Sequence, residues 1–364
     1  ILNYWGQKQD RITALRGKYR WAPTVKQVQN MDSGTQNLLQ DDKVYLMIGF
    51  GGMASYIAQS IVDQVNSKVV IMHRSSLPSR DSWDTLDSET HSAQLIRKID
   101  AIKNARNAHN IHFIQGDCTH LADVKDVVAK AEETLGEIAG VIHTAGVIDN
   151  GGVIHRRDKA SLIKAMASKV HGSINLEQVF KEKGLDFMIL FSSIGNELYD
   201  EKFGQSGYNA ANEFMESYCY YESNVDRKIT INWCDWKEVG MAVTALEENF
   251  AGNQSVMEAY ENMSITPAQG QQIFHQICKS RLDNVLVSTV DLIERIKKRE
   301  AVLEDYKAFV DAYVDQQNDG DQLSDVVFES TGNLETDIAN IWKDYLGYDS
   351  IGRSENIFEL GASS

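Results

Sequence analysis

Short runs of apolar residues recur along the middle of the chain, separated by segments long enough to form helices. The runs are nearly continuous in apolar character, which is typical of parallel strands covered on both faces. They predict strands at residues 44–48, 68–72, 111–114, 139–143, 187–191, 229–233 and 284–288. Segments with the length and composition of helices lie between them, at 56–65, 123–135 and 159–183.

Strands and helices that alternate in this way predict an α/β fold with a doubly wound, parallel, Rossmann-type sheet of about seven strands and helices on both faces. In such sheets, ligands bind at the carboxyl ends of the strands, where the strand order reverses. The residues that directly follow each apolar run are therefore the first place to look for chemistry.

The two ends of the chain depart from this alternation. Residues 1–40 are interpreted as an arm, with a β-hairpin in "ITALRGKYRWAP", followed by a linker. Residues 41–295 hold the predicted α/β domain, and 296–330 are interpreted as the rest of a charged helix and a polar linker. Residues 331–364 contain an amphipathic helix and a loop, too little to bury a core, so we interpret them as an incomplete domain.

The chain is acidic, with 36 Lys and Arg against 52 Asp and Glu and a formal net charge of −16. Such a surface disfavours nucleic acid and anionic membranes as partners. No apolar run approaches the ~18 residues that read as a membrane-spanning helix, and no secretory signal is recognisable. Because the sequence opens on Ile1, we expect a piece of a longer cytoplasmic protein.

The four cysteines and nine histidines show no spacing typical of a disulfide framework or a zinc site. We therefore expect reduced thiols, as in cytosolic proteins, and no bound metal.

The first apolar run ends in a glycine-rich turn, within "VYLMIGFGGMAS". Gly49, Gly51, Gly52 and Ala54 match the spacing G-x-G-x-x-A, which lets backbone N–H groups approach a pyrophosphate at the start of a helix. The turn predicts a dinucleotide site, and its three glycines are candidate cofactor-binding residues.

Four residues at a characteristic spacing are the strongest chemical signal in the chain. Lys169 lies in "ASKVHGSINLEQVF", Ser193 ends "FMILFSS", and Tyr208 and Asn212 lie one helical turn apart in "GQSGYNAANEF". These stretches resemble the K-V-x-G, F-S-S and Y-A-A-A-N motifs of the ketoreductase domains of modular polyketide synthases, a branch of the short-chain dehydrogenase/reductase family. The resemblance covers about residues 40–295.

The resemblance implies reduction of a ketone, which needs a hydride from a nicotinamide and a proton for the developing alkoxide. Tyr208 would donate that proton; a free phenol has a pKa of about 10, and the Lys169 ammonium would favour the phenolate. Ser193 would hydrogen-bond the carbonyl oxygen, and Asn212 would hold the lysine and a proton-relaying water. The stretch from Ser193 to Tyr208 is about two residues longer than usual in that family, which predicts an altered substrate fit.

Three further stretches resemble the parts of that family that bind NADPH. They supply the other candidate cofactor-binding residues, Arg74 and Ser75 in "HRSSLP", Asp117 and Cys118 in "QGDCT", and Ala145 and Gly146 in "HTAGV". The resemblance implies that the first pair clasps the 2′-phosphate, the second the adenine edge, and the third the nicotinamide ribose. The glycine turn is one residue shorter than the family's T-G-G-x-G-G-x-G, and we interpret it as remodelled but working.

The end of the chain, "ETDIANIWKDYLGYDSIGRSENIFELGASS", resembles the start of an acyl or peptidyl carrier domain. Ser364 falls on the serine that receives phosphopantetheine in such domains. The opening arm resembles the exit from the structural subdomain that accompanies these reductases. The predicted partners are therefore a carrier-tethered acyl chain and neighbouring synthase domains in the same polypeptide.

The sequence thus predicts NADPH-dependent reduction of a carrier-bound β-keto or α-keto thioester to the hydroxyacyl thioester. Two alternatives stay open: a catalytically inactive, structural pseudo-ketoreductase, and an α-keto acyl reductase of a depsipeptide-forming nonribosomal peptide synthetase. The stretch "VIDNG" keeps Asp149 from the L-D-D motif of one stereochemical class but has Asn150 in place of the second Asp. It does not fix the stereochemistry of the product.

Overall fold

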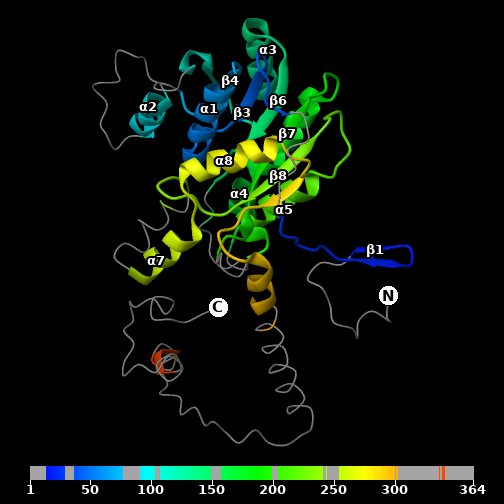
Figure 1. The fold of residues 1–364 in the computed structure, drawn as a ribbon, viewed down its shortest axis with the longest axis vertical. Coiled ribbons are helices and arrows are strands. Elements are labelled where there is room, and N and C mark those ends of the chain that lie inside the picture. The colour runs from blue at the N-terminus through cyan, green and yellow to red at the C-terminus, as the bar shows by residue number, and fades with distance from the viewer. Residues whose placement is uncertain are drawn as a thin grey trace, which may run out of the picture. The chain divides into compact units, whose positions relative to one another are not determined.

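The computed structural model describes residues 14–28, 37–76, 91–102, 107–147, 149, 157–198, 204–240, 243, 254–299, 301, 336 and 338–340 (Figure 1). Asn150, Ser364 and most of the carrier-like segment lie outside these ranges. The chain divides into two compact units, Ile1–Ile296 and Lys297–Ser364, and the α/β fold belongs to the first.

Seven parallel strands form one sheet in the order β5-β4-β3-β6-β7-β8-β9. They are β3 (Val44–Ile48), β4 (Lys68–His73), β5 (Ile111–Gln115), β6 (Ile138–His143), β7 (Phe187–Ser193), β8 (Lys228–Trp233) and β9 (Asn284–Leu286). The order reverses between β3 and β6, which places the switch point of a doubly wound sheet beside the glycine turn. The predicted fold class and its seven strands are confirmed.

Helices connect these strands and cover both faces of the sheet (Figure 1). They are α1 (Gly52–Gln64), α2 (His91–Ile102), α3 (Leu121–Leu135), α4 (Lys159–Phe180), α5 (Ser206–Tyr218), α7 (Gln254–Met263) and α8 (Pro267–Cys278), with short 3-10 turns η3 (Ala108–Asn110) and η5 (Ile194–Asn196). The three predicted helical segments correspond to α1, α3 and α4. The first of them begins four residues earlier than expected, at Gly52, so the glycine turn itself starts the helix.

Side chains alternate between the two faces of each strand and fill two hydrophobic cores. Met47 and Ile71 belong to one core, which also holds the apolar sides of α1, α2 and α8. Leu46 and Val70 belong to the other, with α3, α4 and α5. Every residue of β3, β6, β7 and β8 is buried, which explains why these strands appear in the sequence as continuous apolar runs.

Local signals explain where two of the helices begin. The Asp158 side chain accepts a hydrogen bond from the Ser161 amide at 2.8 Å and caps α4. Thr266 and Gln269 form a reciprocal capping box at the start of α8, and Pro267 occupies the first turn, where its missing N–H costs nothing. Capping residues in the sequence therefore determine where α4 and α8 begin.

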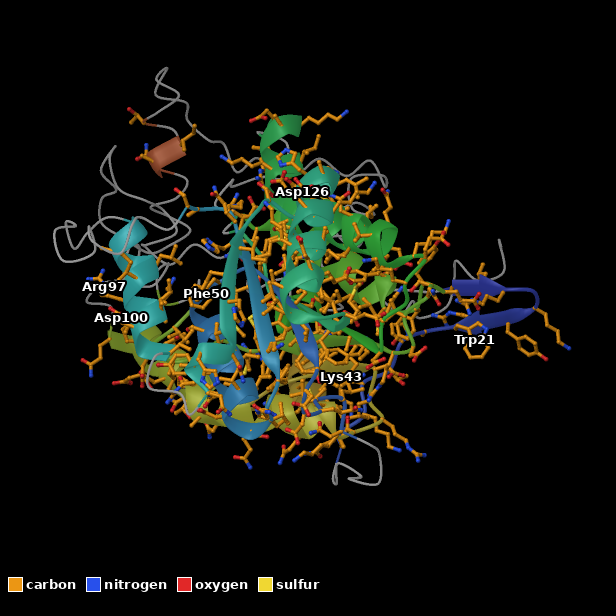
Figure 2. The ribbon with its side chains drawn as sticks, turned by 90° about the horizontal axis from the view of Figure 1, so that it is seen from above. Trp21, Lys43, Phe50, Arg97, Asp100 and Asp126 are labelled. Carbon is orange, nitrogen blue, oxygen red and sulfur yellow. The ribbon has the colours of Figure 1, made fainter. Side chains whose placement is uncertain are left out.

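The expected hairpin is also confirmed, as an antiparallel pair β1 (Ala14–Arg16) and β2 (Tyr19–Trp21). Gly17 adopts a positive φ of 61° in the turn between the strands, a conformation that favours glycine. Trp21, labelled in Figure 2, is 58% exposed. Near the other end, residues 292–299 are helical, and the rest of the expected charged helix lies almost entirely outside the described residues.

Gly140 in β6 generates a testable prediction about the core. A Cβ on this residue would lie 2.4 Å from the ring of its cross-strand partner Phe187. Gly140→Ala is therefore expected to destabilise the fold by about 1–3 kcal/mol, because overpacking a close-packed core forces side chains out of their rotamers. Urea unfolding followed by circular dichroism measures the change.

Phe187→Leu, which shortens the obstructing side chain, is the matched control. In the Phe187→Leu background, Gly140→Ala should cost less than it does alone, since contacting residues do not contribute additively. If the losses in unfolding free energy from the two substitutions simply add, Phe187 is not the obstacle.

Candidate active site

The loops that follow four adjacent strands leave the sheet at the same level. The Gly49 amide donates to the Met72 carbonyl at 2.9 Å, and the Thr144 amide donates to the Ile48 carbonyl at 2.9 Å. On the other side of β4, the Gly116 amide donates to the His73 carbonyl at 3.0 Å. These bonds bring the predicted cofactor stretches together at the carboxyl edge, on both sides of the switch point.

The glycine turn is held against the loop after β6. Gly49 has φ of +92°, and a Cβ there would lie 3.0 Å from the backbone of Ala145. Only glycine fits this close approach. The next residue, Phe50, is buried and packs edge-on against Phe113 of β5, with ring centroids 5.1 Å apart, so its ring anchors the shortened turn beside the sheet (Figure 2).

The turn leaves an open approach to the start of α1. Gly51 is the N-cap residue, its backbone is extended, and nothing lies within 4 Å of where its Cβ would be. The first amides of a helix have no intrahelical partner, and together with the helix dipole they favour an anion. A Cβ on Gly52 would lie 2.8 Å from the Val239 side chain, so Val239 blocks that side of the turn. The shortened turn thus fits a pyrophosphate.

The stretches after β4 and β5 face each other across the edge. Arg74 is exposed. Burial raises the pKa of the Cys118 thiol to about 12, the Asp117 charge raises it further, and the Arg74 charge acts in the opposite direction. Asp117 uses one carboxylate oxygen to accept the Thr119 amide at 2.9 Å. Cys118 is only 5% exposed, and its carbonyl accepts a hydrogen bond from the Asn175 side chain at 2.9 Å.

Lys169 is buried where α4 meets β7 and α5. Its side-chain amine donates to the Phe191 carbonyl at 2.5 Å and lies 3.6 Å from the sulfur of Met215. Because Lys169 is only 4% exposed and burial disfavours the charged amine, its pKa is lowered to about 7. Phe191 precedes Ser193 by two residues on β7, so Lys169 reaches the end of the same strand.

The Ser193 hydroxyl is oriented by the 3-10 turn that follows β7. It accepts a hydrogen bond from the Gly195 amide at 3.1 Å, and Ser193 as a whole residue is 7% exposed. No acceptor for its own O–H lies among the described residues. The predicted hydrogen bond from this hydroxyl to a substrate oxygen stays a prediction.

Tyr208 lies in the first turn of α5, and Asn212 lies one turn later. The Asn212 side-chain amide donates to the Tyr208 carbonyl at 2.9 Å, while its oxygen is buried without a partner in the part of the chain that the structure describes. Buried acceptors of this kind are ordinarily satisfied by water or a ligand. The Lys169 amine contacts Phe191 and Met215, so the expected contact between Asn212 and the lysine stays a prediction.

A partly buried polar network behind these residues was not predicted from the sequence. The Glu216 carboxylate accepts from Asn196 at 2.9 Å and from Asn284 at 2.6 Å. Ser192 donates to the Asn212 carbonyl at 3.2 Å and accepts from Asn196 at 3.2 Å. The network ties α5 to the ends of β7 and β9. Its only sequence signal is the presence of asparagines beside or within apolar runs.

His143, at the end of β6, is a second buried group near the lysine. Its Nε2 lies 3.0 Å from the Ser168 carbonyl, and burial, followed by the Lys169 charge, lowers its pKa to about 3. The ring is therefore neutral near pH 7 and donates to Ser168. It fixes α4 at the residue that precedes Lys169.

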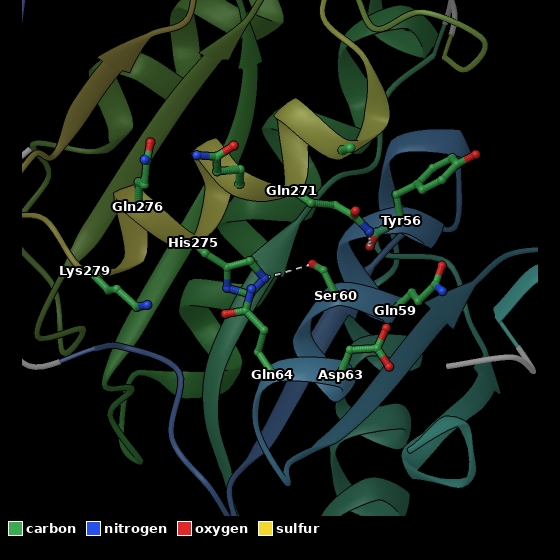
Figure 3. Close-up of a pocket in the computed structure, with 11 residues that line it drawn as sticks. Tyr56, Gln59, Ser60, Asp63, Gln64, Gln271, His275, Gln276 and Lys279 are labelled. Atoms are coloured by element: carbon green, nitrogen blue, oxygen red, sulfur yellow. Dashed lines mark hydrogen bonds between the residues drawn. The ribbon is translucent and has the colours of Figure 1, made fainter. Parts of the chain in front are cut away.

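A polar groove of about 620 Å³ lies between α1 and α8 (Figure 3). It is lined by glutamines and by His275, whose Nε2 lies 3.1 Å from the Ser60 hydroxyl. None of the predicted site residues lines it.

In the described ranges, no helix is long and apolar enough to cross a membrane. Those same ranges hold no group of three or more His, Cys, Asp or Glu side chains that could bind a metal ion. The four cysteines are free and buried.

The sequence model of the KR domain family, in which KR stands for ketoreductase, matches residues 43–238, more than half of the chain. The chain belongs to the KR domain family. The matched range runs from the start of β3 to the segment after β8 and includes all four catalytic candidates.

Curated relatives of this KR chain are large synthases. A 6-methylsalicylic acid synthase of Penicillium patulum is 26% identical over 234 residues, which are 64% of this chain and 13% of that protein. Polyketide synthase PksL of Bacillus subtilis is 26% identical over 295 residues, 79% of this chain and 6% of its own length. The chain spans about an eighth or less of these relatives.

Solved structures share the fold. A ketoreductase domain from the bacillaene assembly line matches with a TM-score of 0.60 and 21% identity, over 78% of this chain and 64% of that one. A multidomain structure of a keto acid-selecting NRPS module, with adenylation, ketoreductase and pseudo Asub domains, matches with a TM-score of 0.61 and 17% identity, over 78% and 22% of the two chains. At these identities the likeness shows the fold alone.

The buried Lys169 amine predicts a pH dependence of stability. Its pKa is about 7 in the folded protein against the ordinary 10.5, so between these values the unfolded chain binds more protons than the folded one. The free energy of unfolding therefore gains a contribution that rises with pH across this window, and the cost of burying the charge is fully present below pH 7.

Lys169→Met removes this contribution. Relative to the variant, the parent protein should gain stability as the pH is raised from neutrality towards 10, measured by urea unfolding of both proteins. Lys125→Met, at an exposed position of α3, controls for the loss of a lysine. Parallel stability curves for the parent and Lys169→Met would contradict the assignment.

Proposed function

We propose that this chain is an active ketoreductase that uses NADPH to reduce a carrier-bound β-keto or α-keto thioester to the hydroxyacyl thioester. The observation that carries the proposal is that Lys169, Ser193, Tyr208 and Asn212 lie on three packed elements, α4, β7 and α5. Those elements adjoin the carboxyl edge that holds the open glycine turn. A structural pseudo-ketoreductase would need neither feature.

The chain's own residues would hold NADPH at the carboxyl edge. The first amides of α1 beyond Gly51 would receive the pyrophosphate, and Arg74 with Ser75 would receive the 2′-phosphate. Asp117 and Cys118 would border the adenine. Ala145 and Gly146, next to the glycine turn, would border the nicotinamide ribose. The bound cofactor supplies the hydride.

The catalytic side chains would handle the substrate oxygen and its proton. Ser193 donates its O–H to the keto oxygen, a contact that stabilises the developing charge by roughly 3 kcal/mol. Tyr208 donates the proton that completes the alcohol. Lys169, whose pKa is about 7, carries a positive charge in part of the molecules at neutral pH and favours the phenolate that Tyr208 leaves behind. Asn212 offers its unpartnered buried oxygen to a relaying water.

The proposed substrate is tethered to a carrier domain. This part of the proposal rests on the carrier-like sequence at the end of the chain, with Ser364 as the attachment site for phosphopantetheine, and on relatives that are large synthases. Neighbouring domains of the same polypeptide are the corresponding partners. Parallel assays with β-keto and α-keto thioesters distinguish a polyketide-type substrate from the keto acyl group of a depsipeptide-forming synthetase.

Tyr208→Phe tests the proposed chemistry. The variant keeps the ring but loses the proton donor, so kcat should fall by about 100-fold or more while NADPH affinity changes by less than about twofold. Loss of NADPH absorbance with a keto thioester measures turnover, and NADPH fluorescence measures binding. Turnover within about threefold of the parent would place the acid elsewhere.

Arg74→Ala tests the proposed contact with the 2′-phosphate. Charge-assisted hydrogen bonds are worth about 1.5–3 kcal/mol each, so NADPH affinity should fall by about 10- to 100-fold while NADH affinity barely changes.

Arg281→Ala, an exposed arginine just before β9 at the opposite edge of the sheet, is the control. It should leave the affinities for both nucleotides unchanged. Equal losses of NADPH and NADH affinity in Arg74→Ala would remove the 2′-phosphate contact from the proposal.

A further inference from the structure

Asp149 and Arg157 form a buried ion pair beside the catalytic helix α5. The two terminal guanidinium nitrogens of Arg157, Nη2 and Nη1, contact the carboxylate oxygens Oδ1 and Oδ2 of Asp149 at 2.6 Å and 2.8 Å. The side chains are only 3% and 2% exposed for Arg157 and Asp149 respectively. A two-pronged contact of this kind fixes orientation as well as charge.

The same carboxylate holds the first turn of α5. One Asp149 oxygen accepts the Gly207 amide at 2.8 Å and the Tyr208 amide at 3.1 Å, and Arg157 also donates to the Ser206 hydroxyl at 3.3 Å. Burial alone would raise the pKa of Asp149, but hydrogen bonds from Arg157 and the two amides hold it below its usual value. The carboxylate therefore stays ionised, with both of its oxygens occupied.

The contact leaves little freedom at the start of the helix. A Cβ on Gly207 would lie 2.9 Å from the Asp149 carboxylate and 3.0 Å from Ala165 of α4. The first turn of α5 is thus pressed against both the ion pair and the helix that carries Lys169.

The ion pair joins three segments that each carry part of the proposed chemistry. Asp149 belongs to the loop after β6, three residues beyond Gly146. Arg157 directly precedes Asp158, the cap of α4. The Gly207 and Tyr208 amides, which donate to Asp149, belong to the first turn of α5. The cofactor loop, the lysine helix and the tyrosine helix therefore meet at one pair of charges.

We propose that the Asp149–Arg157 pair is a positioning device that fixes the Tyr208 turn of α5 against the cofactor loop. This inference rests on the proposed function. Tyr208 belongs to the first turn of α5, whose amides donate hydrogen bonds to Asp149, so a shift of that turn moves the phenol. A misplacement of about 1 Å in a reacting group can cost about 100-fold in rate.

Amide hydrogen exchange tests the anchoring without any turnover. In Asp149→Asn, which keeps the shape of the side chain but loses the charge, exchange in a peptide covering residues 204–212 should be about tenfold faster or more. Peptides from β7 and β8 should be unchanged. Unchanged exchange at residues 204–212 would overturn the proposal.

Kinetics distinguish positioning from a general loss of stability. Asp149→Asn should lower kcat by about 10- to 100-fold, with NADPH affinity within about twofold of the parent. In single turnovers of the Tyr208→Phe variant, the same change should have almost no further effect, because the pair acts through that phenol. Equal losses in the two backgrounds would overturn the proposal.

Asp283→Asn is the control. It removes the Arg227–Asp283 ion pair, with its 3.1 Å contact, and should leave exchange at residues 204–212 and kcat unchanged.

If Asp149→Asn does not fold, Arg157→Lys takes its place with the same expected outcomes, because it keeps the charge but loses the two-pronged contact. A parent chain without turnover would refute the proposed function alone, and the exchange rates would still decide the anchoring.

Discussion

Parallel pairing of β3 with β6 is the constraint on which the site depends. Because these two strands run side by side in the same direction, with Ile48 opposite His143, the turn after one must pass close to the loop after the other. Gly49 meets this requirement, since a Cβ would collide with Ala145. The reversal of strand order at this pair opens the edge to a ligand, and the neighbouring strands add their own loops at the same level.

Buried polar groups surround the candidate site at this edge. Lys169 and Ser193 are almost inaccessible to water, and the interior behind them holds a network of asparagines around Glu216. Burial lowers the pKa of Lys169. For Asp149, hydrogen bonds from Arg157 and two helix amides offset the effect of burial on the carboxylate. Groups that would be unfavourable to bury alone thus hold one another in fixed positions, as the proposed proton transfer requires.

The strands were predictable from the sequence because burial on both faces leaves a continuous apolar run, and each of the seven runs became a strand. The catalytic candidates were predictable as motifs on neighbouring elements. Contacts between distant residues were not. Nothing in the sequence pairs Asp149 with Arg157 or turns Phe50 towards Phe113. Nor does it reveal that the Cys118 side chain is buried, since neighbouring residues in a tight turn can face opposite ways.

The proposed function requires that the shortened glycine turn still hold NADPH. Fluorescence titration of the chain with NADPH, from micromolar to millimolar concentrations, tests it most directly. We expect saturable binding that is weaker than in a relative with the full turn by about tenfold to several-hundredfold, because one or two charge-assisted hydrogen bonds of about 1.5–3 kcal/mol each are lost. An absence of saturable binding would contradict the proposed function and favour a structural pseudo-ketoreductase.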